Sequence, residues 1–207
     1  MQSSYNLALQ AVLKSEGGYV NNPHDSGGAT NYGITQRTYN GWRAKTGKDF
    51  PNPVQHISLD EVAAIYRNQY WDTVQGDALP AGLDYAVFDF GVNSGPSRAL
   101  NTLAETSGST TQRIDQLCDI RLAFLKRLSS WQYFGNGWTT RVANVRSMAK
   151  NMATSPTIAL TAPTVETATM TPREPQTMPQ PHSTAPIGLL QAIIEIIKML
   201  FARKPKP

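Results

Sequence analysis

Glu16 is the residue of this chain best placed for acid chemistry. A carboxylic acid donates a proton at neutral pH only when its surroundings disfavour the ionised form, and burial against apolar groups does this. Glu16 continues the apolar stripe of a predicted helix, and Gly17 and Gly18 after it let the chain turn so that a substrate can approach. The C-terminal end of a helix dipole also disfavours a negative charge there. Taken alone, the same pattern is typical of an ordinary helix end.

The helix that positions Glu16 is predicted from its spacing of apolar residues. They recur at i, i+4, i+7 and i+8, in Tyr5, Leu9, Val12 and Leu13, after Ser3 and Ser4 as capping residues. The segment that follows, YVNNPHDSGGATNYGIT, is rich in Asn, Gly and Asp and has short β-prone pieces. It predicts turns and a small β-hairpin next to Glu16.

The rest of the body is predicted to be helical. A capping box, Ser58-Leu59-Asp60-Glu61, opens a helix through VAAIYRNQYW. Further helices are expected from Leu83 to near Gly95, from Pro96 through ALNTLAE, from Gln112 to Ser130, and from Asn136 to Ala153. We therefore expect a mainly α fold, a helical bundle with one small hairpin.

Four longer strings resemble a known family. SEGGYVNNPHDSGGATNYGIT, residues 15–35, is similar to the N-terminal signature of glycoside hydrolase family 108, the phage and bacterial N-acetylmuramidases. IYRNQYWD (65–72), DYAVFDFGVNSGPSRAL (84–100) and FGNGWTTRVANV (134–145) resemble the middle of that family and the predicted peptidoglycan-binding region after it. The resemblance extends over roughly residues 5–152.

The resemblance implies an α+β lysozyme-like fold and cleavage of the β-1,4 bond between N-acetylmuramic acid and N-acetylglucosamine. Peptidoglycan is then the partner, Glu16 the catalytic acid, and no metal or cofactor is implied. It divides the body into a lysozyme-like catalytic region, 1–95, and a helical peptidoglycan-binding region, 96–153, packed on it. A phage endolysin of this kind is made in the host cytoplasm and acts in the periplasm or cell wall after holin-dependent release.

Asp25 is the candidate for the second group that glycoside hydrolysis commonly needs. It lies in a polar, Gly-flanked loop, where a carboxylate stays ionised. Phage lysozymes of the wider superfamily show a Glu-x8-Asp-x5-Thr pattern, which this chain resembles at Glu16 and Asp25 but not at Asn31, with Thr30 and Thr35 nearby. Inversion and retention therefore both stay open. Asp25 also has a structural alternative, which is to bind backbone N–H groups of its own loop.

Sugar rings are bound by aromatic faces and by amide or hydroxyl groups. Such side chains gather around the polar loop and on two later helices. We expect substrate contacts from Tyr19, Thr30, Asn31, Tyr32, Gln36, Tyr70 and Asn93. Each of the aromatic residues suits the hydrophobic core equally well.

Positive charge gathers in the second half of the chain. From Ile120 to Val165 there is no acidic residue, whereas the basic residues there include Arg121, Lys126, Arg127, Arg141, Arg146 and Lys150. We expect a basic surface that attracts a polyanion. No nucleic-acid-binding motif accompanies the charge, so nucleic acid is not an expected partner. The single cysteine, Cys118, excludes an internal disulfide, and its helical spacing among apolar residues places it in the core.

The C-terminal quarter differs in composition. Residues 154–186 include 9 Thr and 7 Pro among 33 residues, with no Gly and no aromatic residue, which predicts a disordered linker. An amphipathic helix is expected over 187–203, followed by a basic tail, 204–207. Because this helix is shorter than the roughly 20 apolar residues that span a bilayer, we expect residues 187–206 to lie on an anionic bacterial membrane. Self-association, or docking on the body, fits the same pattern.

Two other activities fit parts of the sequence. A lytic transglycosylase cleaves the same bond with one key glutamate, and a non-catalytic wall- or membrane-disrupting protein would use the basic helices and the tail. A metallopeptidase does not fit, because His24, His56 and His182 have no metal-ligand spacing. The N-terminal sequence MQSSYNLALQ lacks a basic region followed by an apolar run, so no secretory signal is expected.

Overall fold

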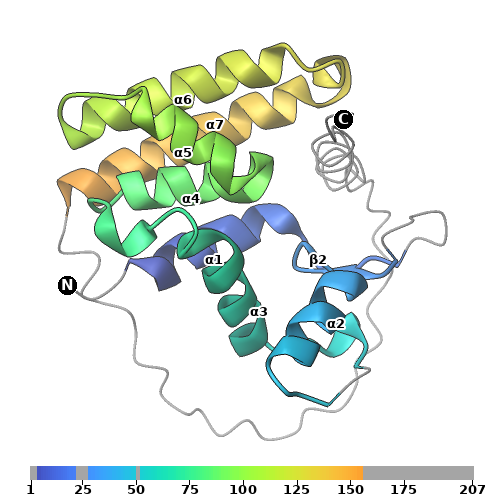
Figure 1. The fold of residues 1–207 in the computed structure, drawn as a ribbon. Coiled ribbons are helices and arrows are strands. Elements are labelled where there is room, and N and C mark those ends of the chain that lie inside the picture. Colours follow the sequence, from blue (N-terminus) through green and yellow to red (C-terminus); the bar gives the residue numbers. More distant parts are fainter. Residues whose placement is uncertain (1–3, 22–27, 50–51, 156–207) are drawn as a thin grey trace, which may run out of the picture.

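A computed structural model describes residues 4–21, 28–49 and 52–155, and helices make up most of this part (Figure 1). The helices are α1 (Tyr5–Glu16), α2 (Gln36–Lys45), α3 (Leu59–Tyr66), α4 (Leu83–Ser94), α5 (Pro96–Ala104), α6 (Thr110–Lys126) and α7 (Trp131–Thr154). Short helical turns are η1 (Val54–His56), η2 (Arg67–Trp71) and η3 (Gly76–Ala78). The hairpin pairs β1 (Thr30–Asn31) with β2 (Ile34–Thr35) in antiparallel register. The expected mainly α, lysozyme-like fold with a small hairpin is confirmed.

Helix α4 forms the centre of the core. All 12 of its residues are buried, which matches a sequence that is apolar around most of the helix. It contacts α1 on one side and α5, α6 and α7 on the other (Figure 1). The N-terminal and C-terminal parts of the described chain therefore meet across one buried helix.

Helices α6 and α7 pack along each other and close the far side of α4 (Figure 1). Cys118 of α6 is fully buried, as its spacing predicted. Helix α7 begins at Trp131, earlier than the expected Asn136, because Trp131 packs against Gly135 and its ring centroid lies 6.1 Å from that of Trp138. This packing stabilises the start of a helix that Gly135 and Gly137 would weaken in isolation.

Helix α2 is absent from the sequence-based prediction. It is polar and buries only Tyr39 of its ten residues, so it has no apolar stripe to recognise. Its start is nonetheless capped, since the Thr35 hydroxyl accepts a hydrogen bond from the Thr38 N–H at 3.1 Å. The Tyr39 hydroxyl donates to Glu61 at 2.7 Å and ties α2 to α3.

The predicted capping box of α3 is present. The Glu61 N–H donates to the Ser58 hydroxyl and the Ser58 N–H donates to the Glu61 carboxylate, each at 3.2 Å. The helix expected to run through Trp71 changes at Arg67 into the π-helical turn η2. Such turns are frequent at functional sites, and this one carries Tyr70.

Several predicted features lie outside the described residues, namely Asp25, nearly all of the linker, the helix over 187–203 and the tail. The division of the body at residues 95 and 96 stays a prediction about the sequence. Across the described ranges, no helix is long and apolar enough to cross a membrane.

Candidate active site

Glu16 is the last residue of α1 and is 7% exposed. Its Oε1 accepts a hydrogen bond at 2.9 Å from Nη2 of Arg141, which lies 125 positions later in the chain, on α7. Both side chains are almost completely buried at this contact. The end of the first helix is therefore paired with a cation from the last one.

Arg141 is oriented by a second carboxylate, Asp89 of α4. Asp89 Oδ2 accepts from Arg141 Nη2 at 2.9 Å and from Nε at 3.2 Å, while its Oδ1 accepts from Arg121 Nη1 at 2.7 Å. We call Glu16, Asp89, Arg121 and Arg141 the buried charge cluster. Two carboxyl groups and two guanidinium groups meet there out of contact with water, and Asp89 fixes Arg141 so that the other side of Nη2 reaches Glu16.

Asp89 is ionised within this cluster. Burial disfavours the charged form, but the charges of Arg141 and Arg121 and their hydrogen bonds outweigh it and hold the pKa of Asp89 below its usual value. Pairing is what makes two buried arginines tolerable, because an isolated charge in the interior is strongly unfavourable.

The hairpin turn lies directly against the carboxyl group of Glu16. Tyr32 and Gly33 have φ values of 49° and 72°, and a two-residue loop with both φ values positive is a type I′ turn. A Cβ atom at Gly33 would lie 3.1 Å from Glu16 Oε2 and 2.8 Å from Tyr66 Oη. Because Gly33 itself is exposed, the acid is buried yet only one backbone layer beneath the surface.

Two tyrosines stand beside the acid. The Tyr66 hydroxyl donates to the carbonyl of Tyr32 at 2.8 Å, which fixes the turn over Glu16. The ring centroids of Tyr66 and Tyr70 are 5.6 Å apart. Burial, and then the charge of Glu16, raise the pKa of Tyr70 to about 12 and that of Tyr66 well above its usual value. Both phenols are therefore neutral hydrogen-bond donors at the pH where an acid catalyst works.

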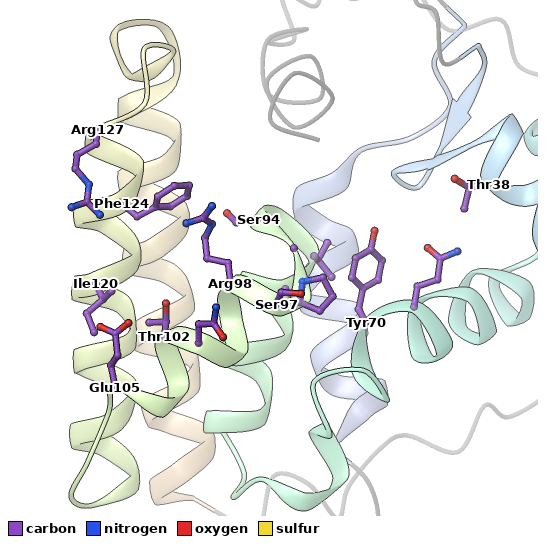
Figure 2. Close-up of a pocket in the computed structure, with 16 residues that line it drawn as sticks. Thr38, Tyr70, Ser94, Ser97, Arg98, Thr102, Glu105, Ile120, Phe124 and Arg127 are labelled. Carbon is purple, nitrogen blue, oxygen red and sulfur yellow. The ribbon is translucent and has the colours of Figure 1, made fainter. Parts of the chain in front are cut away.

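A cavity of about 910 Å³ begins at Tyr70 and extends across the end of α4 to α5 and α6 (Figure 2). Its size falls in the range of ligand sites. In Figure 2, Tyr70 and Thr38 lie on one side, and Phe124 and Arg127 of α6 on the other. Within the described part of the chain, no group of three or more His, Cys, Asp or Glu side chains is placed to hold a metal ion.

Two of the expected substrate-binding amides are engaged inside the protein. The Asn31 amide donates to the carbonyls of Val54 and Gln55, each at 3.3 Å. The Gln36 amide donates to the Asn52 carbonyl at 2.8 Å and accepts from the Val54 N–H at 2.7 Å. Both residues fix the hairpin and α2 against η1, and their contact with substrate stays a prediction.

The other expected contacts differ in exposure. Tyr19 is 42% exposed, whereas Thr30 and Asn93 are buried at 3% and 1%. The Thr30 hydroxyl and the Asn93 Nδ2 have no hydrogen-bond partner among the described residues. Tyr32 contributes its carbonyl to Tyr66, and Tyr70 lines the cavity. Only Tyr70 of this set links Glu16 to the cavity.

The expected basic surface is wrong for four of its six residues. Arg121 and Arg141 are buried in the charge cluster, and Arg146 and Lys150 pair with acidic residues of α6. The acidic partners precede Ile120 in the sequence, and helix packing brings them opposite the basic ones. The burial of Arg121 could have been predicted from the sequence, because this residue lies on the apolar stripe of α6 with Leu117, Cys118 and Leu125.

A mainly α body with a buried glutamate at the end of its first helix, and a hairpin turn over its carboxyl group, is the arrangement expected of a lysozyme-like glycoside hydrolase. The family model of glycosyl hydrolase 108 matches residues 9–95. The structure of SagA from Brucella abortus is 38% identical in sequence, covers 72% of this chain and 95% of its own, and superposes with a TM-score of 0.59.

The chain therefore belongs to the glycosyl hydrolase 108 family. No curated protein matches it. Membership of this family implies a peptidoglycan-hydrolysing activity of the N-acetylmuramidase type.

Proposed function

We propose that the chain is an endolysin that hydrolyses the β-1,4 bond between N-acetylmuramic acid and N-acetylglucosamine, with Glu16 as the general acid. The observation that carries this proposal is the position of Glu16, buried beneath Gly33 and paired with Arg141. A positioned acid of this kind contributes typically 10²–10⁴-fold to a rate.

The role of Glu16 follows from the charge that develops during cleavage. Its proton passes to the glycosidic oxygen as the bond from that oxygen to C1 of the muramic acid ring breaks, and the carboxylate that remains is stabilised by the hydrogen bond from Arg141. The neutral hydroxyl of Tyr70 is a donor near this developing charge, whereas the Tyr66 hydroxyl donates to the Tyr32 carbonyl and holds the turn over Glu16. Water completes the hydrolysis at C1.

The second catalytic group is proposed to be Asp25. Asp89, the other carboxylate in contact with Arg141, is unsuited to attack or to activate water, because both its oxygens accept hydrogen bonds from buried arginines. Asp25→Asn should lower the rate at least tenfold if its carboxylate acts on water or on C1. An unchanged rate would contradict this assignment and favour its structural alternative.

The test of the main proposal is Glu16→Gln on purified, lipid-free peptidoglycan. Glutamine keeps the size of the side chain and a hydrogen bond to Arg141 but has no proton to give, so release of new reducing ends should fall by 10² or more. Asp60→Asn, which removes an exposed carboxylate from α3, is the matched control and should leave the rate unchanged. Equal release of reducing ends by wild type and Glu16→Gln would contradict the role of Glu16 as the acid, and clearing of the wall by wild type without new reducing ends would favour the non-catalytic alternative.

Mass spectrometry of the products separates hydrolysis from the transglycosylase alternative. Hydrolysis adds one water to each cleaved bond, whereas an anhydro product is lighter by one water. Anhydro ends as the main product would replace the proposed reaction by transglycosylation while keeping Glu16 as its acid.

The biological setting is also a proposal. We infer that the protein is made in the host cytoplasm, reaches the periplasm and cell wall through a holin-made lesion, and contacts an anionic membrane through residues 187–206. The basic residues Arg203, Lys204 and Lys206 support this contact. Deletion of residues 186–207 should reduce killing of intact Gram-negative cells and spare activity on purified wall. Equal loss on both substrates would contradict the membrane role.

A further inference from the structure

The cavity beyond Tyr70 contains charged groups that the proposed cleavage does not use. Arg98 of α5 and Arg127 of α6 line it, and Glu105 lines it as well (Figure 2). Among the described residues, none of the three forms a salt bridge. By contrast, Arg146 and Lys150 on the opposite side of the α6–α7 pair are each matched with aspartates. The cavity therefore combines two available cations with one available anion.

Arg98 is held in a defined position. Its Cζ lies 3.9 Å from the centroid of the Phe124 ring, a cation–π contact between α5 and α6. Its Nε is buried and has no hydrogen-bond partner in the described part of the chain. A fixed guanidinium with an unused donor, in a cavity of about 910 Å³, is suited to bind a carboxylate.

We propose that this cavity binds the short peptide that N-acetylmuramic acid carries on its lactyl group, with Arg98 and Arg127 holding its carboxylates and Glu105 its free amino group. This inference rests on the proposed function, because it takes the cleaved ring to be muramic acid. That ring carries the lactyl group on O3, and C3 is two carbons from C1, where the bond to the protonated oxygen breaks. A peptide leaving the ring there starts next to the acid. Tyr66 lies with Glu16 against Gly33, its ring centroid is 5.6 Å from that of Tyr70, and Tyr70 lines the cavity.

The cavity carries both positive and negative side chains, and this mixture favours a wall peptide over other polyanions of the cell envelope. A phosphate-rich polymer carries negative charge alone, and Glu105 would repel it. A wall peptide carries carboxylates together with the amino group of a diamino acid, and this matches two arginines and one glutamate. Apolar side chains of the lining, such as Phe124 and Ile120, suit its alanine methyl groups.

The kinetic test compares two substrates, purified peptidoglycan and the same glycan strands stripped of peptide by an amidase. Wild type should have the higher kcat/KM on peptide-bearing strands, and Arg98→Gln and Arg127→Gln should each reduce this preference on the order of tenfold, the effect of one charge-assisted hydrogen bond. Lys126→Gln is the matched control, since it removes the same charge from the neighbouring exposed position of α6. An unchanged preference in both arginine variants would overturn the inference.

A binding measurement keeps this inference separate from the proposed function. The full chain with Glu16→Gln is titrated with the disaccharide bearing a tetrapeptide and with the peptide-free disaccharide. Tighter binding of the first ligand, lost on adding Arg127→Gln, supports the inference whether or not the wild type cleaves. Equal binding of both ligands overturns it. Failure of the wild type to cleave either strand would contradict the proposed function alone, and the titration would still decide the occupant of the cavity.

Discussion

Arg141 Nη2 donates to Glu16 Oε1 at 2.9 Å across the interior of the protein, and the same guanidinium is held by Asp89. The contact joins the last residue of α1 to the middle of α7. It gives the proposed acid one fixed orientation and places a cation next to the carboxylate that forms when the proton leaves.

Arg141→Gln should reduce kcat by about 10² while substrate binding changes little, because the lost interaction acts on the charge that develops in the transition state. Arg141→Lys keeps a cation next to Glu16 and should therefore retain part of the kcat that Arg141→Gln loses. A fall in activity that tracks only loss of folded protein, seen by circular dichroism, would contradict the positioning role.

Asp89→Asn should cost about 3–5 kcal/mol of unfolding free energy, because it leaves Arg121 and Arg141 buried with half of their negative partners removed. Since the pKa of Asp89 is lower in the folded than in the unfolded protein, its contribution is full above the ordinary aspartate value and is lost as the pH falls through the folded value. Urea unfolding of Asp89→Asn should therefore show a flatter decline below about pH 4.

The control for this prediction is Asp119→Asn. It breaks the ion pair with Arg146, in which Asp119 is 68% exposed, and should cost less than about 1 kcal/mol. Similar costs for the two variants would show that burial does not set the strength of the charge cluster.

Gly33→Ala should reduce activity more than tenfold at a modest cost in stability. The positive φ costs about 1–2 kcal/mol for alanine, and the new methyl group must displace Tyr66 Oη or Glu16 Oε2. Gly47→Ala is the matched control, because Gly47 has a φ of 68° and open space around its Cβ position. Comparable kcat/KM for the two alanine variants would mean that the close approach to the acid has no catalytic consequence.

Ser58→Ala should lower the unfolding free energy by about 1 kcal/mol, since it removes the hydrogen bond to the Glu61 N–H at the start of α3. Ser130→Ala changes the same residue type at the start of α7, where the side chain makes no capping bond, and should have a much smaller effect. Thermal unfolding of the pair measures the difference. Equal decreases in Tm for the two variants would show that the capping box does not stabilise the protein.

The sequence alone predicted the features that are local or periodic. The stripe of α1, the Ser58 capping box and a small hairpin in the segment after α1 each depend on neighbouring residues, and each is present. Helix α2 escaped prediction because a polar helix that buries only Tyr39 has no stripe. Its stability comes from contacts with α3 that a local pattern does not contain.

The site was predictable in part. Glu16 was reached from its own helix and from the family resemblance, but its partner Arg141 lies 125 positions away, and charge counting placed that arginine on the surface. The amides of Gln36 and Asn31 are suited to bind sugars, yet in the structure they form hydrogen bonds with the backbone of residues 52–55. Contacts between residues so far apart in the sequence arise when helices pack around α4, and no short segment of the sequence predicts them.

The pairing of Glu16 with Arg141 also bears on how genes for such enzymes are recombined. A fusion that joined residues 1–95 to a foreign wall-binding module would keep Glu16 and Asp89 but lose Arg121 and Arg141, the two arginines of the buried charge cluster. It would also bury Asp89 without a counter-charge. The part of the chain that must be kept together therefore extends at least from α1 to α7, and crossovers that preserve activity should fall beyond α7.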